Sequence, residues 1–242
     1  MNPQTRLVDF TVVAASMMFG CGSIILLIGA RAFGYSNHGW SEPTILAWDT
    51  ALSLLFFVQH SGMVRTSFRS RLATVVATRY LGAIYSIASG IALSIVVVFW
   101  QRSQIHLFQP EGMLLWLARV CALSAIMIFA LSIYSLRSFD MFGIGPIRAH
   151  MRGSAYVPGP FVVRGPYRWV RHPFYSCILV LFWTNPEITT DRLLFNVLWT
   201  GWIYLGTFLE ERDLRSEFGT SYLEYQKQVP RFFPWRRPAA IS

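Results

Sequence analysis

Charged side chains are scarce in this sequence, and acidic ones are scarcer than basic ones. Of 242 residues, 14% are charged, with 12 Asp and Glu against 21 Lys and Arg, whereas 54% are hydrophobic and the mean hydropathy is +0.42. Such an apolar composition excludes an ordinary water-soluble domain. The basic residues lie between apolar runs and form no stripe, so nucleic-acid binding is not expected despite a net charge of +9.

Cysteine is also rare, and motifs typical of several cofactor classes are missing. Cys21, Cys121 and Cys177 lie far apart in apolar runs, fit neither a metal spacing nor a disulfide framework, and predict buried free thiols. Without Cys-x-x-Cys-His, a membrane cytochrome with His60 and His172 as haem ligands is a weaker alternative. No Gly-x-Gly-x-x-Gly follows a strand-like run, so no soluble Rossmann domain is expected. The first nine residues precede a run long enough to span, so no cleavable signal peptide is expected.

Six apolar stretches predict an all-α integral membrane protein with about six transmembrane helices. The first, Phe10 to Ala30, has 21 residues, which suffices to cross a hydrocarbon core of about 30 Å at about 1.5 Å per residue. The last two are separated by Asn185-Pro186 and predict a helical hairpin. In order, the predicted spans are residues 10–30, 44–58, 80–100, 113–136, 174–183 and 193–209.

The spans divide the chain into two predicted regions. Residues 1–137 form a four-span membrane region that includes a basic amphipathic segment, 61–79, on the cytoplasmic leaflet. Residues 138–242 contain a long connection, the hairpin and a polar tail, which we expect to form one structural unit. Asp49, inside the second span, is expected to make a helix-packing contact or to be a polar site residue, and its distance along the span from Gln59 and His60 favours packing.

The basic residues also predict the orientation. With six crossings and a cytoplasmic amino terminus, 17 of the 21 Lys and Arg fall on the cytoplasmic side. We therefore expect both termini in the cytoplasm and a location in the inner membrane of a bacterium. The same layout places Gln59-His60, the segment Val163 to Tyr175 and the carboxyl tail on one side of the membrane.

The segment Val163 to Tyr175 is unusually rich in arginine, proline and aromatic residues. Pro166 and Pro173 each bias the residue before them away from helical geometry. A helix that begins at Pro173 would point free N–H groups and its positive dipole end toward His172. Together with Arg164, Arg168 and Arg171, this arrangement predicts binding of an anionic group.

The carboxyl tail adds groups of the opposite charge and further aromatic rings. Glu210 and Glu211 follow the last predicted span, and Tyr222 and Tyr225 are three apart, on one face of a helix. Arginines can bind a carboxylate, glutamates an ammonium and aromatic rings an adenine, while a carboxylate or ring face tolerates a sulfonium. We expect this tail and the segment Val163 to Tyr175 to form one pocket, although each group alone could equally contact lipid or another tail residue.

These motifs resemble a known family. Gly165-Pro166-Tyr167, Arg171-His172-Pro173 with Tyr175, and Glu210-Glu211 with Tyr222, Tyr225 and Pro230 resemble the carboxyl-terminal signature of membrane methyltransferases related to isoprenylcysteine carboxyl methyltransferase and phospholipid methyltransferases. Gln59-His60-Ser61 with Arg65, and Phe139 to Gly143, resemble the branch of methanethiol S-methyltransferases. The resemblance implies a helical membrane fold that encloses S-adenosylmethionine in its carboxyl-terminal segments, and methyl transfer to a small thiol that converts methanethiol into dimethyl sulfide.

The resemblance also implies roles for individual residues. The expected cofactor-binding residues are Tyr167, Arg171, His172, Pro173, Tyr175, Glu210, Glu211, Tyr222 and Tyr225. A thiol must lose its proton before it attacks, and His60 and Asp140, with Arg65 as a nearby cation, are the candidate catalytic residues. The expected partners are a small thiol and membrane lipid, without a metal or nucleic acid. A prenylated cysteine or lipid-like acceptor stays open, as does a transport or non-catalytic membrane protein.

Overall fold

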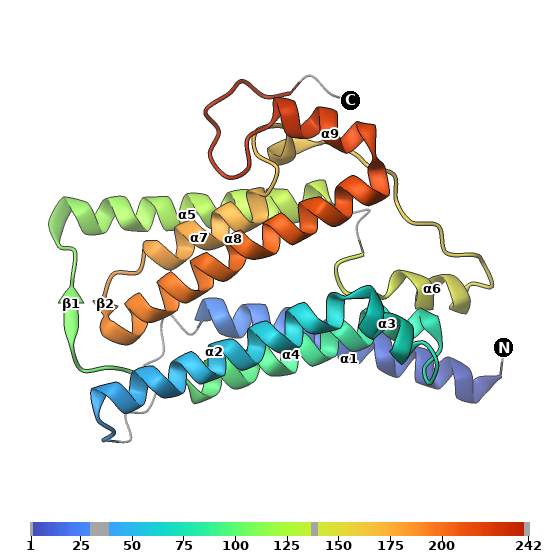
Figure 1. Cartoon of the computed structure of the whole chain (residues 1–242), viewed down its shortest axis with the longest axis horizontal. Coiled ribbons are helices and arrows are strands. Elements are labelled where there is room, and N and C mark those ends of the chain that lie inside the picture. The colour runs from blue at the N-terminus through green and yellow to red at the C-terminus, as the bar shows by residue number, and fades with distance from the viewer. Residues whose placement is uncertain (1, 30–38, 137–139, 240–242) are drawn as a thin grey trace. The chain divides into compact units, whose positions relative to one another are not determined.

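The computed structural model describes residues 2–29, 39–136 and 140–239, and it is mostly helical (Figure 1). The all-α membrane fold is confirmed, with one small two-stranded sheet in addition. In chain order the elements are α1 (Pro3–Gly29), α2 (Glu42–Val64), α3 (Thr66–Leu72), the 3-10 turn η1 (Thr78–Tyr80), α4 (Leu81–Phe99), β1 (His106–Phe108), α5 (Gly112–Ser135), α6 (Gly145–Met151), the 3-10 turn η2 (Gly165–Arg168), α7 (Pro173–Trp183), β2 (Ile188–Thr189), α8 (Thr190–Phe218) and α9 (Thr220–Gln228).

Within the described part of the chain, three helical stretches are long and apolar enough to cross a membrane: Pro3–Leu27, Thr78–Phe99 and Gly112–Ser135. Helix α7 is apolar but has only 11 residues. The protein is therefore an integral membrane protein, whereas the count of six crossings and the orientation stay predictions. Residues 30–38 and 137–139, with Arg31 and Arg137 among them, lie outside the described residues.

The chain contacts group into two units, which are described separately. The first comprises the described residues of 1–103 and 139–158, and the second those of 104–138 and 159–242. Helix α5 packs against α7 and η2 in the second unit, and α6 packs against α1 and η1 in the first. The second unit begins before the expected boundary at residue 137, because α5 packs against α7 and η2.

In the first unit, α4 packs against both α1 and α2. Gly90 of α4 permits this closeness, since a Cβ atom there would overlap the backbone carbonyl of Phe19 in α1. Asp49 is fully buried in α2 and its Oδ1 accepts the backbone N–H of Gln101 at 2.9 Å. That contact is the packing role expected for a carboxylate within a span.

The basic segment after the second predicted span contains two short elements and a break. Helix α2 continues to Val64, and α3 follows with Arg69 and Arg71 in its last turn. None of the α3 side chains is buried, and Phe68 is 40% exposed. Exposed basic and apolar side chains on a short helix suit a membrane surface, which is the location that the sequence predicts.

In the second unit, α5, α7 and α8 run side by side, and α9 with the tail lies at one end of them (Figure 1). At the other end, β1 pairs antiparallel with β2, which links α7 to α8. Helix α8 is longer than expected and continues nine residues past Leu209, so Glu210 and Glu211 lie within it. Its buried side chains follow a helical repeat that ends at Glu211: Phe195, Trp199, Ile203, Thr207 and Glu211.

Candidate functional site

Two X-Pro bonds shape the segment that precedes α7. Gly165 has φ +53°, which favours glycine, and a Cβ atom there would also overlap the side chain of Ser135 in α5. His172 is non-helical, with φ −123° and ψ 59°, and α7 begins at Pro173. The expected geometry of this segment is confirmed, and the first turn of α7 lies directly after His172.

The carboxyl tail docks on this segment through backbone hydrogen bonds. Arg171 N–H donates to the carbonyl of Pro230 at 2.9 Å, and His172 N–H donates to that of Arg231 at 3.1 Å. The hydroxyl of Ser176 in α7 donates to the carbonyl of Phe232 at 3.0 Å. The two sequence motifs, about 60 residues apart, therefore meet as predicted.

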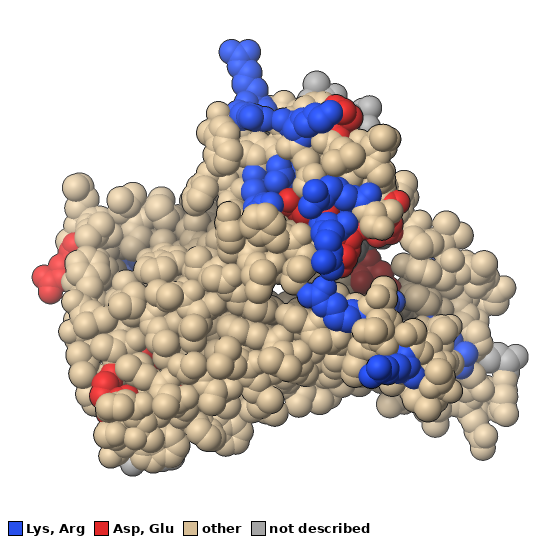
Figure 2. Space-filling model, viewed as in Figure 1, with Lys and Arg blue, Asp and Glu red and all other residues tan. Residues whose placement is uncertain are grey.

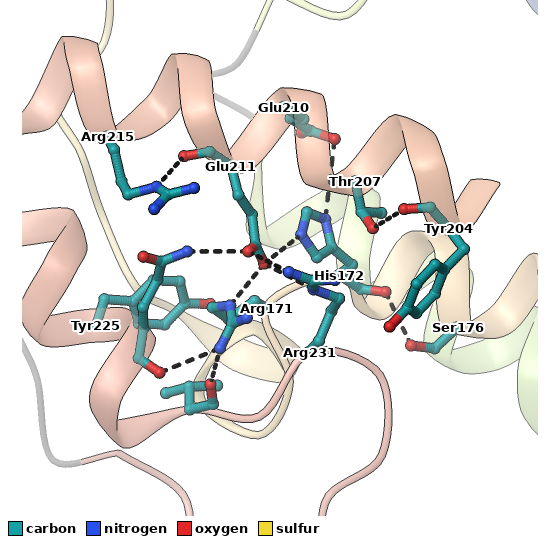
Figure 3. Close-up of polar contacts among 12 residues, drawn as sticks. Arg171, His172, Ser176, Tyr204, Thr207, Glu210, Glu211, Arg215, Tyr225 and Arg231 are labelled. Atoms are coloured by element: carbon teal, nitrogen blue, oxygen red, sulfur yellow. Dashed lines mark hydrogen bonds and ion pairs between the residues drawn. The ribbon is translucent and has the colours of Figure 1, made fainter. Parts of the chain in front are cut away.

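Glu211 is the centre of the resulting cluster (Figure 3). Its carboxylate is 2% exposed and accepts Arg171 Nε at 2.8 Å and Arg231 Nη2 at 2.7 Å. It also accepts His172 Nε2 at 3.0 Å and Gln226 Nε2 at 2.9 Å. Burial alone would raise the pKa of Glu211, but the hydrogen bonds from His172, Arg231 and Arg171 outweigh it and hold that pKa far below its ordinary value. Glu211 is thus an ionised group that binds four side chains: Arg171, His172, Gln226 and Arg231.

His172 lies between both glutamates of the pair. Because the Glu211 carboxylate only accepts hydrogen bonds, His172 Nε2 carries a proton and donates it toward Glu211. Its Nδ1 lies 3.8 Å from Glu210 Oε2, and the Glu210 side chain is 44% exposed, whereas that of His172 is 4% exposed. Glu210 is therefore accessible to a ligand beside a buried imidazole, and the ring of Tyr175 lies 5.6 Å from that of His172.

Both arginines of the cluster are held firmly. Arg171 Nη1 donates to the carbonyls of Gln226 at 3.1 Å and Val229 at 2.5 Å, at the C-terminal end of α9, where a cation is favourable. Arg231 lies 4.0 Å above the ring of Phe208 in α8. The sequence did not indicate that Arg231 and Gln226 would join the cluster, because tail residues carry no periodic signal that shows which of them turn inward.

The predicted tyrosines occupy the core next to this cluster. Tyr222 and Tyr225 are 2% and 3% exposed and pack with Val163, and the Tyr225 hydroxyl donates to the carbonyl of Tyr167 at 2.7 Å. Burial raises the pKa of the phenols of Tyr167, Tyr222 and Tyr225 well above the ordinary value, so all three are neutral donors. Their expected proximity on one helical face is confirmed, and contact with an adenine stays a prediction.

A groove of about 430 Å³ opens beneath the tail. Tyr204 of α8, Arg171 of the segment before α7 and Gln226 of α9 line it together with tail residues from Val229 to Arg236. Most of its residues were not among the predicted site residues, although the run Arg231 to Arg236 is aromatic and basic. Its lining residues are Arg171, Tyr204, Gln226, Val229, Pro230, Arg231, Phe232, Phe233, Trp235 and Arg236.

The three candidate catalytic residues lie in the first unit. His60, near the end of α2, contacts two side chains of α4, with Nε2 2.7 Å from the Tyr85 hydroxyl and Nδ1 3.1 Å from Ser89 Oγ. Both carboxylate oxygens of Asp140 accept backbone N–H groups at the start of α6, from Ile144 at 2.9 Å and Gly145 at 2.7 Å.

Asp140 thus stabilises the amino terminus of α6. Arg65 lies at the break between α2 and α3, and Phe139 of the branch motif is outside the described residues. The catalytic roles of His60, Asp140 and Arg65 stay predictions.

Metal ligands do not gather in the described ranges 2–29, 39–136 and 140–239, where no three His, Cys, Asp or Glu side chains are placed to hold an ion. Cys21, Cys121 and Cys177 are free thiols, but only Cys177 is buried as expected, whereas Cys21 and Cys121 are partly exposed.

Comparisons of the sequence with family profiles and with known proteins agree on one family. The profile of the family described as NnrU protein matches residues 50–185, more than half of the chain. A methanethiol S-methyltransferase of Pseudomonas deceptionensis is 35% identical over 82% of this chain and 76% of its own length. Methanethiol S-methyltransferase 1 of Bradyrhizobium diazoefficiens is 32% identical over 94% of this chain and 80% of its own length.

A more distant relative is Nurim of Rattus norvegicus, which is 28% identical over 74% of each chain. No solved structure matches the chain significantly. The motif resemblance, the family profile and the relatives above 30% identity agree with one another and with the helical membrane fold. The chain belongs to the NnrU protein family, within the isoprenylcysteine methyltransferase-like membrane superfamily, and it is a methyltransferase.

Proposed function

We propose that the protein transfers a methyl group from S-adenosylmethionine to a small thiol, converting methanethiol into dimethyl sulfide. Two relatives that cover most of the chain are named for methanethiol S-methylation. The observation that carries the cofactor assignment is the cluster itself, in which Arg171 and His172 meet Glu210 and Glu211. A ligand with both a carboxylate and an ammonium needs groups of both charges in one place.

The residues of the cluster have different proposed roles in binding the cofactor. The exposed carboxylate of Glu210 suits the ammonium and the sulfonium, and the positive dipole end of α7, which begins at Pro173, suits the ligand carboxylate. Glu211 is fully occupied by protein contacts, so it acts by positioning His172 and Arg171. Tyr175 lines the site beside His172, while Tyr167, Tyr222 and Tyr225 support it from the core.

The bound cofactor would supply an already activated methyl group, so the protein must mainly align the thiol, exclude water and accept a proton. We propose that His60 accepts the proton of the thiol at its ring. The contacts with Tyr85 and Ser89 hold that ring in one orientation. Arg65 would stabilise the thiolate that is left after the proton has moved to His60, and the cofactor, when bound, would supply the methyl group.

The reaction is tested by incubating the purified full chain with methyl-labelled S-adenosylmethionine and four acceptors in parallel. Methanethiol should give labelled dimethyl sulfide in mass spectrometry. Hydrogen sulfide, a prenylcysteine and phosphatidylethanolamine serve as alternative acceptors. Labelling of the prenylcysteine or the lipid, with no labelled dimethyl sulfide, would replace the thiol assignment by a lipid-like acceptor, and no labelled product at all would contradict the proposal.

The cofactor assignment is tested by calorimetry of S-adenosylmethionine binding to Glu210→Gln. Loss of a hydrogen bond to a charged group should weaken the affinity roughly tenfold or more. Asp213→Asn is the matched control, because Asp213 is 58% exposed on the same helix and pairs with the exposed Arg212. Equal affinities of both variants and the parent would remove Glu210 from the site.

The catalytic assignment is tested by His60→Ala. We expect kcat/KM for methanethiol to fall at least tenfold with little change in cofactor affinity, since general-base catalysis typically contributes about 10²-fold or more. A rate within about threefold of the parent, below ~1 kcal/mol in transition-state stabilisation, would exclude His60.

We also propose that both termini face the cytoplasm of a bacterial cell, with the protein in the inner membrane. The excess of Lys and Arg on one set of connections supports this orientation. A reporter that is active only in the periplasm should be inactive when it is fused to either terminus. Activity at either end would show that the orientation or the number of crossings differs from the proposal.

A further inference from the structure

The groove beneath the tail has chemistry that the cofactor does not require. It is lined by three arginines and four aromatic residues, and none of its described lining residues is acidic. S-adenosylmethionine carries an ammonium, a sulfonium and one carboxylate, so its net charge is positive and three guanidinium groups oppose it. Arginines next to aromatic rings suit an anion that is attached to an apolar body.

The positive charge of the groove is only partly neutralised by the protein. Arg171 and Arg231 share the single carboxylate of Glu211. Arg236 donates to the carbonyl of Lys227 at 2.5 Å, a neutral acceptor, and its side chain is exposed. The groove therefore presents an excess of positive charge, with Arg231 fixed over Phe208.

An exposed apolar stripe on α8 leads into this groove. Its members recur at helical spacing and are 37–57% exposed: Leu193, Val197, Tyr204, Leu205 and Phe208. Phe195, Trp199 and Ile203, on the opposite face of α8, are buried. The stripe covers about 22 Å along the helix at about 1.5 Å per residue, which exceeds one leaflet of a hydrocarbon core about 30 Å thick.

The tail above the stripe has the composition of a membrane interface. Phe233 and Trp235 are 68% and 66% exposed, and Arg236 and Arg237 follow them. Exposed tryptophan and arginine are typical of the headgroup level. Figure 2 shows basic side chains gathered at this end of the second unit, next to a face of its helices without charge.

We propose that this groove binds an anionic phospholipid. Its phosphate lies at Arg231 and Arg236, one acyl chain follows the exposed stripe of α8, and Trp235 packs at the level of the headgroup. The groove shares Arg171 with the cluster that we assign to the cofactor, whereas Glu210 and His172 do not line it. The tail is anchored by its backbone contacts with Arg171 and His172, so bound lipid stabilises the same segment that shapes the cofactor side.

The test is native mass spectrometry of the purified full chain in detergent, with phosphatidylglycerol or phosphatidylcholine of identical acyl chains. We expect phosphatidylglycerol to be retained at least about tenfold more strongly. Arg236→Gln should reduce its occupancy about fivefold, the effect of one arginine at an anionic surface. Arg237→Gln is the matched control, because Arg237 is adjacent and exposed but does not line the groove. The phosphatidylglycerol occupancy of Arg237→Gln should stay within about twofold of that of the parent.

Four results would overturn the proposal. Equal retention of both lipids would remove the charge selectivity, and equal losses in Arg236→Gln and Arg237→Gln would indicate diffuse attraction without a site. Displacement of the lipid by S-adenosylmethionine would assign the groove to the cofactor. Displacement by millimolar inorganic phosphate would make it a small-anion site. The melting temperature of each variant is recorded in parallel, and both are expected to match the parent, since both side chains are exposed.

Discussion

Replacing Glu211 by glutamine should destabilise the second unit strongly, although the change adds no volume. The carboxylate is buried and binds Arg171, Arg231 and His172. A neutral amide leaves two guanidinium groups, 11% and 18% exposed, without a counter-charge. One amide also cannot accept all the donors that now converge on the carboxylate.

The magnitude follows from burial. Breaking a buried ion pair by removing one partner costs about 3–5 kcal/mol. Arg171 keeps its hydrogen bonds to the carbonyls of Gln226 and Val229, and Arg231 keeps its place over Phe208, so the lower end applies. About 3 kcal/mol corresponds to a melting temperature lower by roughly 6–12 °C for a chain of this size.

The pH dependence of this effect has a definite sign. The pKa of Glu211 is depressed in the folded state, so the carboxylate stabilises the fold at pH values above its unfolded pKa of about 4.3. That stabilisation is lost only as the pH falls below this value toward the folded pKa. The difference in melting temperature between parent and Glu211→Gln should therefore be constant at neutral pH and shrink in acid.

The assay is thermal unfolding of both proteins in one detergent across this pH range. Glu224→Gln is the matched control, because Glu224 also pairs at 2.7 Å, with Lys227, but its side chain is 60% exposed. Removing that pair should change stability by no more than about 0.5 kcal/mol. If Glu211→Gln melted within about 2 °C of the control, below 1 kcal/mol, the central role of Glu211 would be refuted.

Two further predictions concern packing in each unit. Gly90→Ala should destabilise the contact between α4 and α1 by about 1–3 kcal/mol, because the new methyl overlaps Phe19, whereas Gly22→Ala, which meets nothing within 4 Å, should leave the melting temperature unchanged or raised. Tyr225→Phe removes the hydrogen bond to the Tyr167 carbonyl and should lower stability by about 1 kcal/mol, or roughly 2–4 °C. An unchanged melting temperature in either Gly90→Ala or Tyr225→Phe would contradict the corresponding contact.

Much of the fold could be predicted from composition and local chemistry. The apolar runs predicted the helices α1, α2, α4, α5, α7 and α8 but not the short helix α6, and the prolines at 166 and 173 predicted a break followed by a helix start. The end of α8 could not be predicted, because charged residues after an apolar run indicate where a hydrophobic stretch ends and not where a helix ends. Helix α8 continues to Phe218, where Gly219 with φ +56° terminates it.

The sequence predicted which residues of the site would meet better than it predicted the role of each residue. Motif spacing indicated that Arg171, His172 and the glutamates would meet, and they do. The tyrosines were expected to face a ligand, but helical spacing alone shows only that Tyr222 and Tyr225 share a face, not what covers that face. Which tail residues turn inward depends on backbone pairing between residues 171–172 and 230–231, and such long-range pairing has no local sequence signal.

The paired glutamates illustrate how helical geometry assigns different roles to identical neighbours. Adjacent residues on an α-helix point about 100° apart, so Glu210 and Glu211 point in different directions. Glu211 continues the buried stripe of Thr207 and Ile203 and becomes the internal counter-ion, whereas Glu210 points to the exposed side of His172. Glu210→Gln should therefore weaken cofactor binding with little change in melting temperature, and Glu211→Gln should lower both. The reverse pattern, a low melting temperature in Glu210→Gln with unchanged affinity, would show that the two roles are exchanged.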